Sequence, residues 1–277
     1  MCIRDSITAG TGVTLESLND NTGTIALLSS GGIDGGSGTV LMRAANYAFG
    51  GADRTITTTG VLTIEPDADE NSFASSFDNQ YLNPVSVTGL TLGKSSNASA
   101  ITLSRAISLS GPVSIYGGSI DVNANITANS GNILLDADTG STLNQSSTGI
   151  LLDDAITIET VTSGNLTLIG RSGDTGSGFD GIDASSANTT TLRSAGNLTL
   201  QGYSYAASGS GRGVDLNNDV IAASGTVSMT GQHNTGATYA LSLSGSTSIT
   251  AGTGVTLESL NNNTCLLYTS PSPRDPT

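Results

Sequence analysis

The stretch Ser130-Gly-Asn-Ile-Leu-Leu135 recurs along the chain as Ser163-Gly-Asn-Leu-Thr-Leu168 and Ala195-Gly-Asn-Leu-Thr-Leu200. Looser copies follow at Ser224-Gly-Thr-Val-Ser-Met229 and Thr253-Gly-Val-Thr-Leu257. In most copies apolar residues alternate with Ser or Thr after the glycine. Alternation with a period of two is typical of a β-strand that has one buried and one exposed face. Each copy therefore predicts a short strand that begins just after a glycine corner.

The spacing of these copies indicates a repeat architecture. The lead glycines follow one another at nearly equal intervals, and they are Gly131, Gly164, Gly196, Gly225 and Gly254. A coil of this length cannot bury its apolar face alone, whereas stacked coils pair their strands about 4.8 Å apart and enclose an aliphatic interior. We therefore predict an all-β solenoid with coils of roughly 30 residues, in which eight or nine coils form a rod about 40 Å long.

Composition argues against several classes of partner. Charged residues make up 12% of the chain, against about 25% in ordinary globular proteins. The net charge is -14, and Lys and Arg together number only 9, which argues against binding to nucleic acid or to anionic membranes. The recurring aliphatic clusters are foreign to disordered chains, and no apolar run reaches the roughly 20 residues of a membrane-spanning helix.

The two ends of the chain differ from the rest. Residues 1–6 and 265–277 read as MCIRDS and CLLYTSPSPRDPT, and both resemble translated transposon-adapter DNA from sequencing libraries. We expect both to be adapter-derived, and residues 7–264 to be an internal, metagenomic fragment of a longer chain. Since Cys2 and Cys265 lie in these ends, the native part would hold neither a disulfide nor a cysteine-metal site.

A longer repeat frames the fragment. The residues from Ile7 to Asn19 recur without change from Ile249 to Asn261, at an offset of 242 residues. Similarity between coils is otherwise loose, so this block indicates either a recent duplication or an artefact of sequence assembly. We expect the parent chain to carry large units repeated in tandem.

The residues Gly111 to Leu135 and Ile56 to Pro66, together with the Gly-Asn-Leu-Thr-Leu runs, resemble the repeat region of filamentous haemagglutinin-type exoproteins. The same pattern fits other β-helical autotransporter passengers. The resemblance implies a right-handed, single-stranded parallel β-helix and two-partner secretion through an outer-membrane export pore. It also implies a secreted or cell-surface adhesin that contacts a host or neighbouring cell surface, with glycans among its targets. The expected function is non-catalytic, structural and adhesive.

A carbohydrate-active β-helix enzyme, either a hydrolase or a lyase, is the first alternative. Asp153-Asp154 resembles the paired aspartates of polygalacturonases, in which two carboxylates act across a glycosidic bond. The Gly-His-Gly and Arg-Ile-Lys motifs that accompany that pair are absent. His233, the only histidine, is expected in a solvated loop. We therefore assign no catalytic residue and no cofactor.

Two acidic segments raise the question of calcium. Asp136-Ala-Asp-Thr-Gly140 and Glu65-Pro-Asp-Ala-Asp-Glu-Asn71 cluster the oxygen ligands that Ca²⁺ prefers. Neither has the spacing of an EF-hand, and Gly31-Gly-Ile-Asp-Gly-Gly36 resembles the calcium β-roll motif only weakly. Weak Ca²⁺ binding by these acidic loops is an alternative to ordinary acidic loops, and no metal site is assigned.

An ice-binding solenoid is the second alternative, suggested by Thr57, Thr59 and the run from Thr189 to Thr191. Such a protein needs Thr-x-Thr at one corner of every coil on a flat face. Threonine is instead scattered among Ser, Asn and Asp along this chain.

Two segments interrupt the coil rhythm, Asp67 to Pro84 and Gly170 to Asn188. Insertions in solenoids often project and carry binding. Their aromatic residues are Phe73, Phe77, Tyr81 and Phe179. We favour the interpretation that these rings fold back over the flank of the solenoid. Tyr203 and Tyr205 either form a small exposed platform suited to sugars or pack on a neighbouring coil.

Overall fold

The computed structural model describes most of the chain, and the adapter-like end 265–277 lies outside that part. The described residues are 2–3, 6–17, 22–27, 32–67, 70–137, 147–153, 155–174, 177–185, 188–206, 209–234 and 239–260. Within them all regular structure is β-strand, so the all-β prediction is confirmed. None of these residues forms a helix long and apolar enough to cross a membrane.

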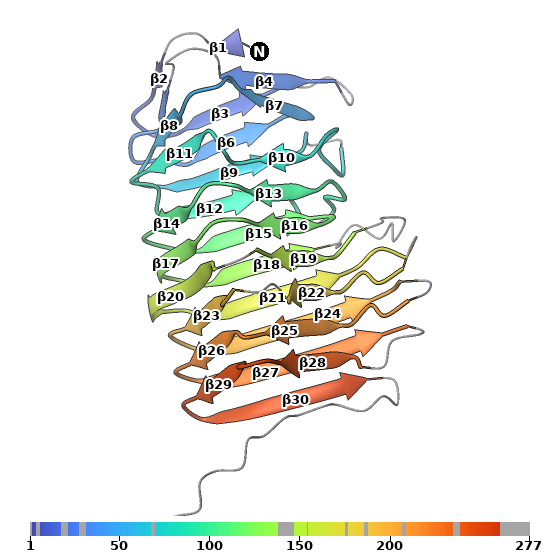
Figure 1. Ribbon diagram of the computed structural model, residues 1–277. Coiled ribbons are helices and arrows are strands. Elements are labelled where there is room, and N and C mark those ends of the chain that lie inside the picture. Colours follow the sequence, from blue (N-terminus) through green and yellow to red (C-terminus); the bar gives the residue numbers. More distant parts are fainter. Residues whose placement is uncertain are drawn as a thin grey trace, which may run out of the picture.

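The longest sheet has ten parallel strands and runs the length of the molecule (Figure 1). We call it the long sheet. Its strands are β3 (Val13–Glu16), β6 (Val40–Arg43), β9 (Val61–Glu65), β12 (Gly89–Leu92), β15 (Val113–Gly117), β18 (Ile133–Ala137), β21 (Leu166–Arg171), β24 (Leu198–Ser204), β27 (Thr226–His233) and β30 (Gly254–Leu260). Every third strand along the chain therefore belongs to the long sheet, and we call one such step of three strands a coil.

The strands before each long-sheet strand form a second stack. A four-stranded sheet holds β2 (Ile7–Thr8), β5 (Ile33–Asp34), β8 (Arg54–Thr57) and β11 (Leu82–Val85). A six-stranded sheet follows with β14 (Ile107–Leu109), β17 (Ile126–Ser130), β20 (Thr157–Ser163), β23 (Thr191–Ser194), β26 (Val220–Ala223) and β29 (Ser248–Ala251).

The strands after each long-sheet strand form the third stack. A three-stranded sheet holds β1 (Cys2–Ile3), β4 (Thr24–Leu27) and β7 (Asn46–Phe49). A seven-stranded sheet follows with β10 (Phe77–Asp78), β13 (Ile101–Leu103), β16 (Ile120–Val122), β19 (Ile150–Leu152), β22 (Ile182–Ala184), β25 (Val214–Asn217) and β28 (Leu241–Ser244). All pairs in the three stacks are parallel, as expected for stacked coils.

The strand register corrects the predicted coil length for the first half of the chain. Val40 pairs with Leu62 and Val113 pairs with Ile133, so several early coils are much shorter than predicted. The predicted period fits best from β18 onward, where the partners in successive strands are Ile133, Leu166, Leu198, Val227 and Val255. The register also pairs Gly254 with Thr226, so Thr253 and not Gly254 occupies the position of the earlier lead glycines.

The Gly-Asn motif forms the corner between the six-stranded sheet and the long sheet. Gly131 and Gly164 have φ values of 117° and 112°, which residues with a Cβ rarely adopt. The side-chain oxygen of Asn132 accepts the backbone N–H of Asn165 at 2.8 Å, and that of Asn165 accepts the N–H of Asn197 at 2.8 Å. Each asparagine therefore fixes the height of the next coil at this corner.

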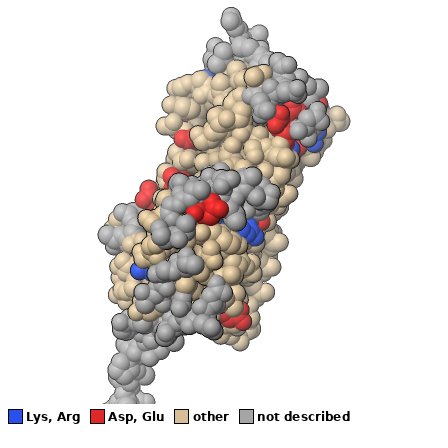
Figure 2. Space-filling view, turned by 90° about the vertical axis from the view of Figure 1, so that its right-hand side faces the viewer, with Lys and Arg blue, Asp and Glu red and all other residues tan. Residues whose placement is uncertain are grey.

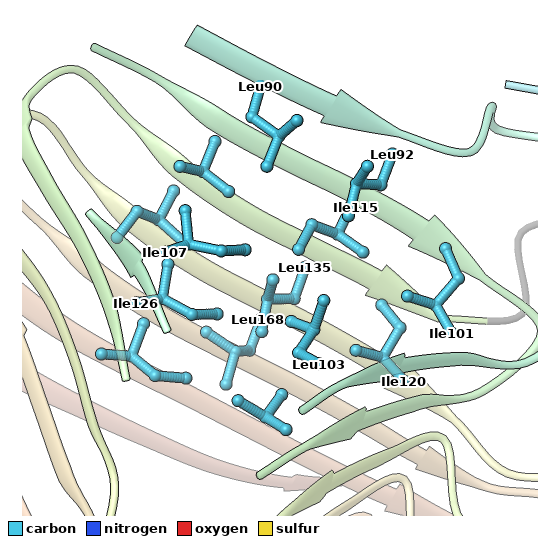
Figure 3. Close-up of a cluster of buried hydrophobic side chains, with 14 of the residues drawn as sticks. Leu90, Leu92, Ile101, Leu103, Ile107, Ile115, Ile120, Ile126, Leu135 and Leu168 are labelled. Atoms are coloured by element: carbon cyan, nitrogen blue, oxygen red, sulfur yellow. The ribbon is translucent and has the colours of Figure 1, made fainter. Parts of the chain in front are cut away.

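The alternating apolar residues fill a continuous interior between the stacks. In the long sheet, Ile133, Leu135, Leu166 and Leu168 are fully buried, while the residues between them are half-buried on the outer face. Figure 3 shows leucine and isoleucine side chains from successive coils packed in one aliphatic cluster. Burial of these rows is the main favourable contribution to folding.

The longest described connections lie at a single corner, between the long sheet and the third stack. At this corner residues 172–181 separate β21 from β22 and residues 205–213 separate β24 from β25. The Gly-Asn corner needs only residues 131–132 or 164–165. The two segments expected as insertions also contribute strands to coils: β10 lies in the first and β22 in the second.

An aromatic cluster fills a break in the third stack. The three-stranded sheet ends at β7 and the seven-stranded sheet begins at β10, and these two strands do not pair. Tyr47 and Phe49 contact Phe77 edge-on with centroids 5.7 and 6.0 Å apart, and Phe73 stacks on Phe77 at 5.6 Å. Phe73 and Phe77 are buried, which confirms that these rings fold back, while Tyr81 is half-buried.

We predict that Leu135→Ala lowers the stability of the fold by about 2–5 kcal/mol, because it removes buried methyl groups from a core that cannot collapse around the cavity. The neighbouring Leu134→Ala, on the outer face of the same strand, is the matched control and should cost far less. Urea denaturation followed by circular dichroism compares the two. Equal losses would contradict the observed inward and outward assignment of β18.

Candidate functional site

One column of outward positions on the seven-stranded sheet carries most of its acidic residues. Strand pairing places one residue of each strand in this column, and they are Asp78, Thr102, Asp121, Leu151, Asp183, Asp215 and Ser242. Neighbouring members lie about 4.8 Å apart along the stacking axis. Carboxylates that lie far apart in the sequence therefore line one face, beside the corner with the long connections.

Two of these acidic side chains converge with a third from outside the column. Asp183 and Asp215 are directly paired on β22 and β25, and Asp180 lies in the connection just before β22. One carboxylate oxygen of each lies within 4.8 Å of the others. Arg212 contacts two of them, since its guanidinium pairs with Asp215 and its backbone N–H donates to Asp180. We call Asp180, Asp183 and Asp215 the acidic triad.

Burial dominates the electrostatics of the triad. Asp180 is 7% exposed, and loss of water raises the pKa of its carboxyl to about 7, with further contributions from the nearby Asp183 and Asp215. The N–H of Arg212 opposes this rise. Burial also raises the pKa of Asp215, although a hydrogen bond from Ser242 and the charge of Arg212 lower it in part. The arrangement holds one proton near neutral pH next to other carboxylates.

A second buried acid stabilises the turn between β25 and β26. Asp219 is fully buried, and its carboxylate accepts the backbone N–H groups of Thr190 at 3.0 Å and Asn217 at 2.9 Å. Burial raises its pKa to about 6, although these two hydrogen bonds favour the ionised form. Its contacts are with the backbone of its own and a neighbouring coil, so its role is structural.

An open cleft of about 260 Å³ lies further along the same column. Thr102, Asp121 and Leu151 form its floor on three successive coils, and Phe179 and Ser147 contribute from the connections. Among the described residues no hydrogen-bond partner reaches Asp121 Oδ1, which is buried. Burial, with the nearby charge of Asp153, raises the pKa of Asp121. Leu151 is 40% exposed and offers an apolar surface at the cleft.

The chemistry of this cleft suits binding better than hydrolysis. A glycosidase needs two carboxyl groups on either side of an accessible bond. Within the described residues, only Asp121 lines the cleft with a carboxylate, while Asp180 and Asp215 of the acidic triad contact Arg212. A carboxylate acceptor, two or more hydroxyls and the apolar surfaces of Leu151 and Phe179 fit a ligand with hydroxyl donors and an apolar face.

Of the residues weighed for catalysis, the structure describes Asp153 and His233. Asp153 is exposed and follows β19, and Asp154 lies outside the described residues. His233 is not a solvated loop residue, because it ends β27 on the inward side with 5% exposure. Burial lowers the pKa of its imidazole. The period of two along β27 explains its position, since Val227, Met229 and His233 share one face of the strand.

Two carboxylates of the acidic segments considered for calcium pair with arginines of the chain. Asp136 pairs with Arg171 at 2.8 Å, and Glu65 pairs with Arg43 at 2.5 Å. Asp67 is buried, and its backbone oxygen accepts the Lys94 ammonium at 3.0 Å. The members that lie outside the described residues are Asp138 to Gly140, Ala68, Asp69 and Gly31. Where the structure describes these segments, the carboxylates of Glu65 and Asp136 thus face cations of the chain itself.

The remaining aromatic and threonine candidates are dispersed. Tyr203 is half-buried and stacks under the guanidinium of Arg171 on the neighbouring strand, 5.7 Å from the ring centroid. It packs on the neighbouring coil, and Tyr205 is also half-buried, so the described residues provide no exposed platform there. The threonines considered for ice binding are split between two sheets, because Thr57 lies on β8, Thr59 follows it and Thr191 begins β23.

A hydroxyl column on the long sheet was not foreseen. Its members are Thr14, Thr63, Thr91, Ser114, Thr167, Thr199, Ser228 and Thr256, with Leu41 and Leu134 between them. The outward column two residues further along each strand combines charged, aromatic and aliphatic residues. It includes Glu16, Arg43, Tyr116 and Ile169. The described part of the long sheet thus lacks the repeated Thr-x-Thr that ice binding requires.

The acidic column also lay outside the sequence predictions, although a signal for it exists. Asp121, Asp183 and Asp215 each stand between two apolar residues, in Ile-Asp-Val, Ile-Asp-Ala and Val-Asp-Leu. An acid inside such a triplet faces outward on a short strand.

Comparison of the chain with protein families, with curated proteins and with solved structures finds no match.

We predict that Asp180→Asn flattens the pH dependence of stability. The folded-state pKa of Asp180, about 7, lies above the unfolded value of about 4, so its contribution to stability is greatest below the unfolded value. This contribution falls as the pH rises and levels off above about 7. Denaturation midpoints at pH 5 and pH 8 should differ less in the variant, which gains at pH 8, than in the native chain, and Asp219 accounts for part of the remaining difference.

The control for this experiment is Glu159→Gln on β20, in the six-stranded sheet, which lies in another stack. It should leave the difference between the two midpoints unchanged. An Asp180→Asn variant that loses stability at pH 8 would show that the ionised carboxylate supports the fold there.

Proposed function

We propose that this chain is a non-catalytic, structural and adhesive segment of a large secreted or cell-surface exoprotein. In this proposal residues 7–264 form a right-handed, single-stranded parallel β-helix, exported through an outer-membrane pore. The segment extends the protein from its cell and presents one face to a host or neighbouring cell surface. The single observation that carries the proposal is the uninterrupted parallel long sheet.

The length of that sheet supports a role in extending the protein away from its cell. Ten strands in register, about 4.8 Å apart, give a rod of about 40 Å from one end to the other. Each coil contacts mainly its neighbours, so length is added without any change in cross-section. Short corners and an aliphatic interior suit a spacer, whose task is to hold its shape over a distance.

The outer surface supports presentation to other molecules. Its charged side chains form small, separate patches among uncharged residues on the face that Figure 2 shows. A net charge of -14 keeps an extended rod soluble and disfavours nucleic acid. The cleft around Asp121 is a recess on the acidic column, and its mixture of carboxylate, hydroxyl and apolar surface suits a glycan.

A carbohydrate-active enzyme is the second candidate, and the acidic triad favours it. Asp180, with a pKa of about 7, lies close to Asp183, and glycosidases use one protonated and one ionised carboxyl group. Against it, Asp180 and Asp215 are buried and both contact Arg212. Both of these carboxylates are thus already engaged by the chain itself.

We predict that the purified chain binds immobilised glycans and that Asp121→Asn weakens this binding about tenfold, the effect of one charge-assisted hydrogen bond. Glu159→Gln is again the matched control, because it makes the same chemical change on another stack. Glycan-array binding, followed by titration of the strongest ligand, provides the measurement. Binding that is equal in both variants would place the ligand site elsewhere.

The same samples distinguish adhesion from catalysis. Incubation with the bound polysaccharide should release no reducing ends and no unsaturated sugars. Release that Asp180→Asn abolishes would overturn the non-catalytic proposal in favour of the enzyme.

A further inference from the structure

The block of sequence that occurs twice occupies the same place in its coil both times. In the first copy Ile7 and Thr8 form β2, and Val13 to Glu16 form β3 of the long sheet. In the second copy Ile249 and Thr250 lie in β29, and Val255 to Glu258 lie in β30 of the same long sheet. β2 and β29 both belong to the second stack. The duplication is therefore in phase with the structure.

The distance between the copies is a whole number of coils. β3 and β30 are the first and last of ten strands in the long sheet, so nine pairing steps separate them. The coils in between differ in length, since Ile133 pairs backward with Val113 but forward with Leu166. A duplication that took no account of structure would therefore end at an arbitrary point of a coil.

In the first copy, the following coil completes the contacts of this block. β3 pairs with β6, which places Val13 beside Val40 and Leu15 beside Met42. The N–H of Val13 donates to Thr39 O at 2.9 Å, and Glu16 pairs with Arg43 at 3.0 Å. Val13 and Leu15 are consequently only 8% and 5% exposed.

In the second copy, the same residues lie at the outer edge of the sheet, the lowest strand in Figure 1. Val255, the counterpart of Val13, is 48% exposed, and Leu260 is 39% exposed. Elsewhere in the sheet the N–H at this position donates to the following coil, as in Val113 to Asn132 O and Leu166 to Asn197 O. The N–H of Val255 therefore lies on the side of β30 where the structure describes no further strand.

A glycine within the block points the same way. A Cβ on Gly12 would lie 2.8 Å from Thr39 O of the following coil, and Gly12 has a φ of 127°. At its counterpart Gly254, no described atom lies within 4 Å of the Cβ position. The block thus retains a residue whose small size is needed only where another coil approaches.

We propose that the open edge of β30 is a docking surface for one specific partner, a coil with the sequence of residues 38–43 in a following copy of this chain. Residues 7–248 then form a nine-coil unit that repeats in tandem as one continuous solenoid. Glu258 would meet the counterpart of Arg43, and Val255 and Leu257 would be buried as Val13 and Leu15 are. The proposal concerns assembly along the axis and does not depend on adhesion or on any ligand.

The test joins residues 20–66 directly after Asn261 of the full chain, which supplies the counterparts of β4 to β9. Hydrogen exchange should show the Val255 amide protected at least about tenfold more than in the unextended chain. The matched control carries Asp at the added counterparts of Val40 and Met42, which are fully buried in the first copy. This control should leave the exchange of Val255 unchanged.

Alanine substitutions provide a second measurement. Gly12→Ala should lower the denaturation midpoint of both chains, whereas Gly254→Ala should lower it only in the extended chain. Equal exchange at Val255 in the extended chain and its Asp control would overturn the proposal. So would a Gly254→Ala variant that is equally harmless in both chains, because the added coil would then not approach β30. Glycan binding is not measured here, so either result leaves the proposed function to its own test.

Discussion

The register of the long sheet is the constraint on which the other features depend. Parallel strands satisfy their backbone groups only through the coils before and after them, and a shift by one residue would turn every apolar side chain outward. The column from Val13 through Val113 to Val227 faces the interior because this register holds from strand to strand. The acidic column and the hydroxyl column follow from the same alignment, since each collects one outward position per coil.

The two corners of each long-sheet strand differ in how much variation in connection length they tolerate. At the Gly-Asn corner, Asn165 both donates to one coil and accepts from the next, so an added residue would break two hydrogen bonds. At the opposite end of each long-sheet strand the described residues show no such repeated ladder, and connections such as 172–181 and 205–213 are long. The candidate site lies beside this variable corner, where new side chains can be added without disturbing the register.

The alternation of apolar and polar residues was sufficient to predict the strands, but it did not show which residues of successive strands pair. Gly131, Gly164 and Gly196 mark similar coils, and the stacked parallel strands that they predict are present. In the earlier coils Gly38, Gly60 and Gly111 hold the same position, but no Asn follows them, so the Gly-Asn marker did not identify these shorter coils. Asp183 and Asp215 become adjacent through pairing of β22 with β25, and their separation equals that of Gly164 and Gly196, a signal that the strand pattern alone did not use. His233 was misplaced because β27 is longer than the apolar triplet that identified it.

The break filled by Tyr47, Phe49, Phe73 and Phe77 has a mechanical consequence. At the step from β7 to β10 the third stack has no backbone pairing, and the second stack has a similar gap from β11 to β14. A rod pulled along its axis would be held at these two levels by fewer hydrogen bonds than elsewhere. Tension would therefore separate the first coils before those from β14 onward, where all three stacks are continuous. In the proposed adhesin, such a rod would yield at one end under load and keep its acidic triad intact.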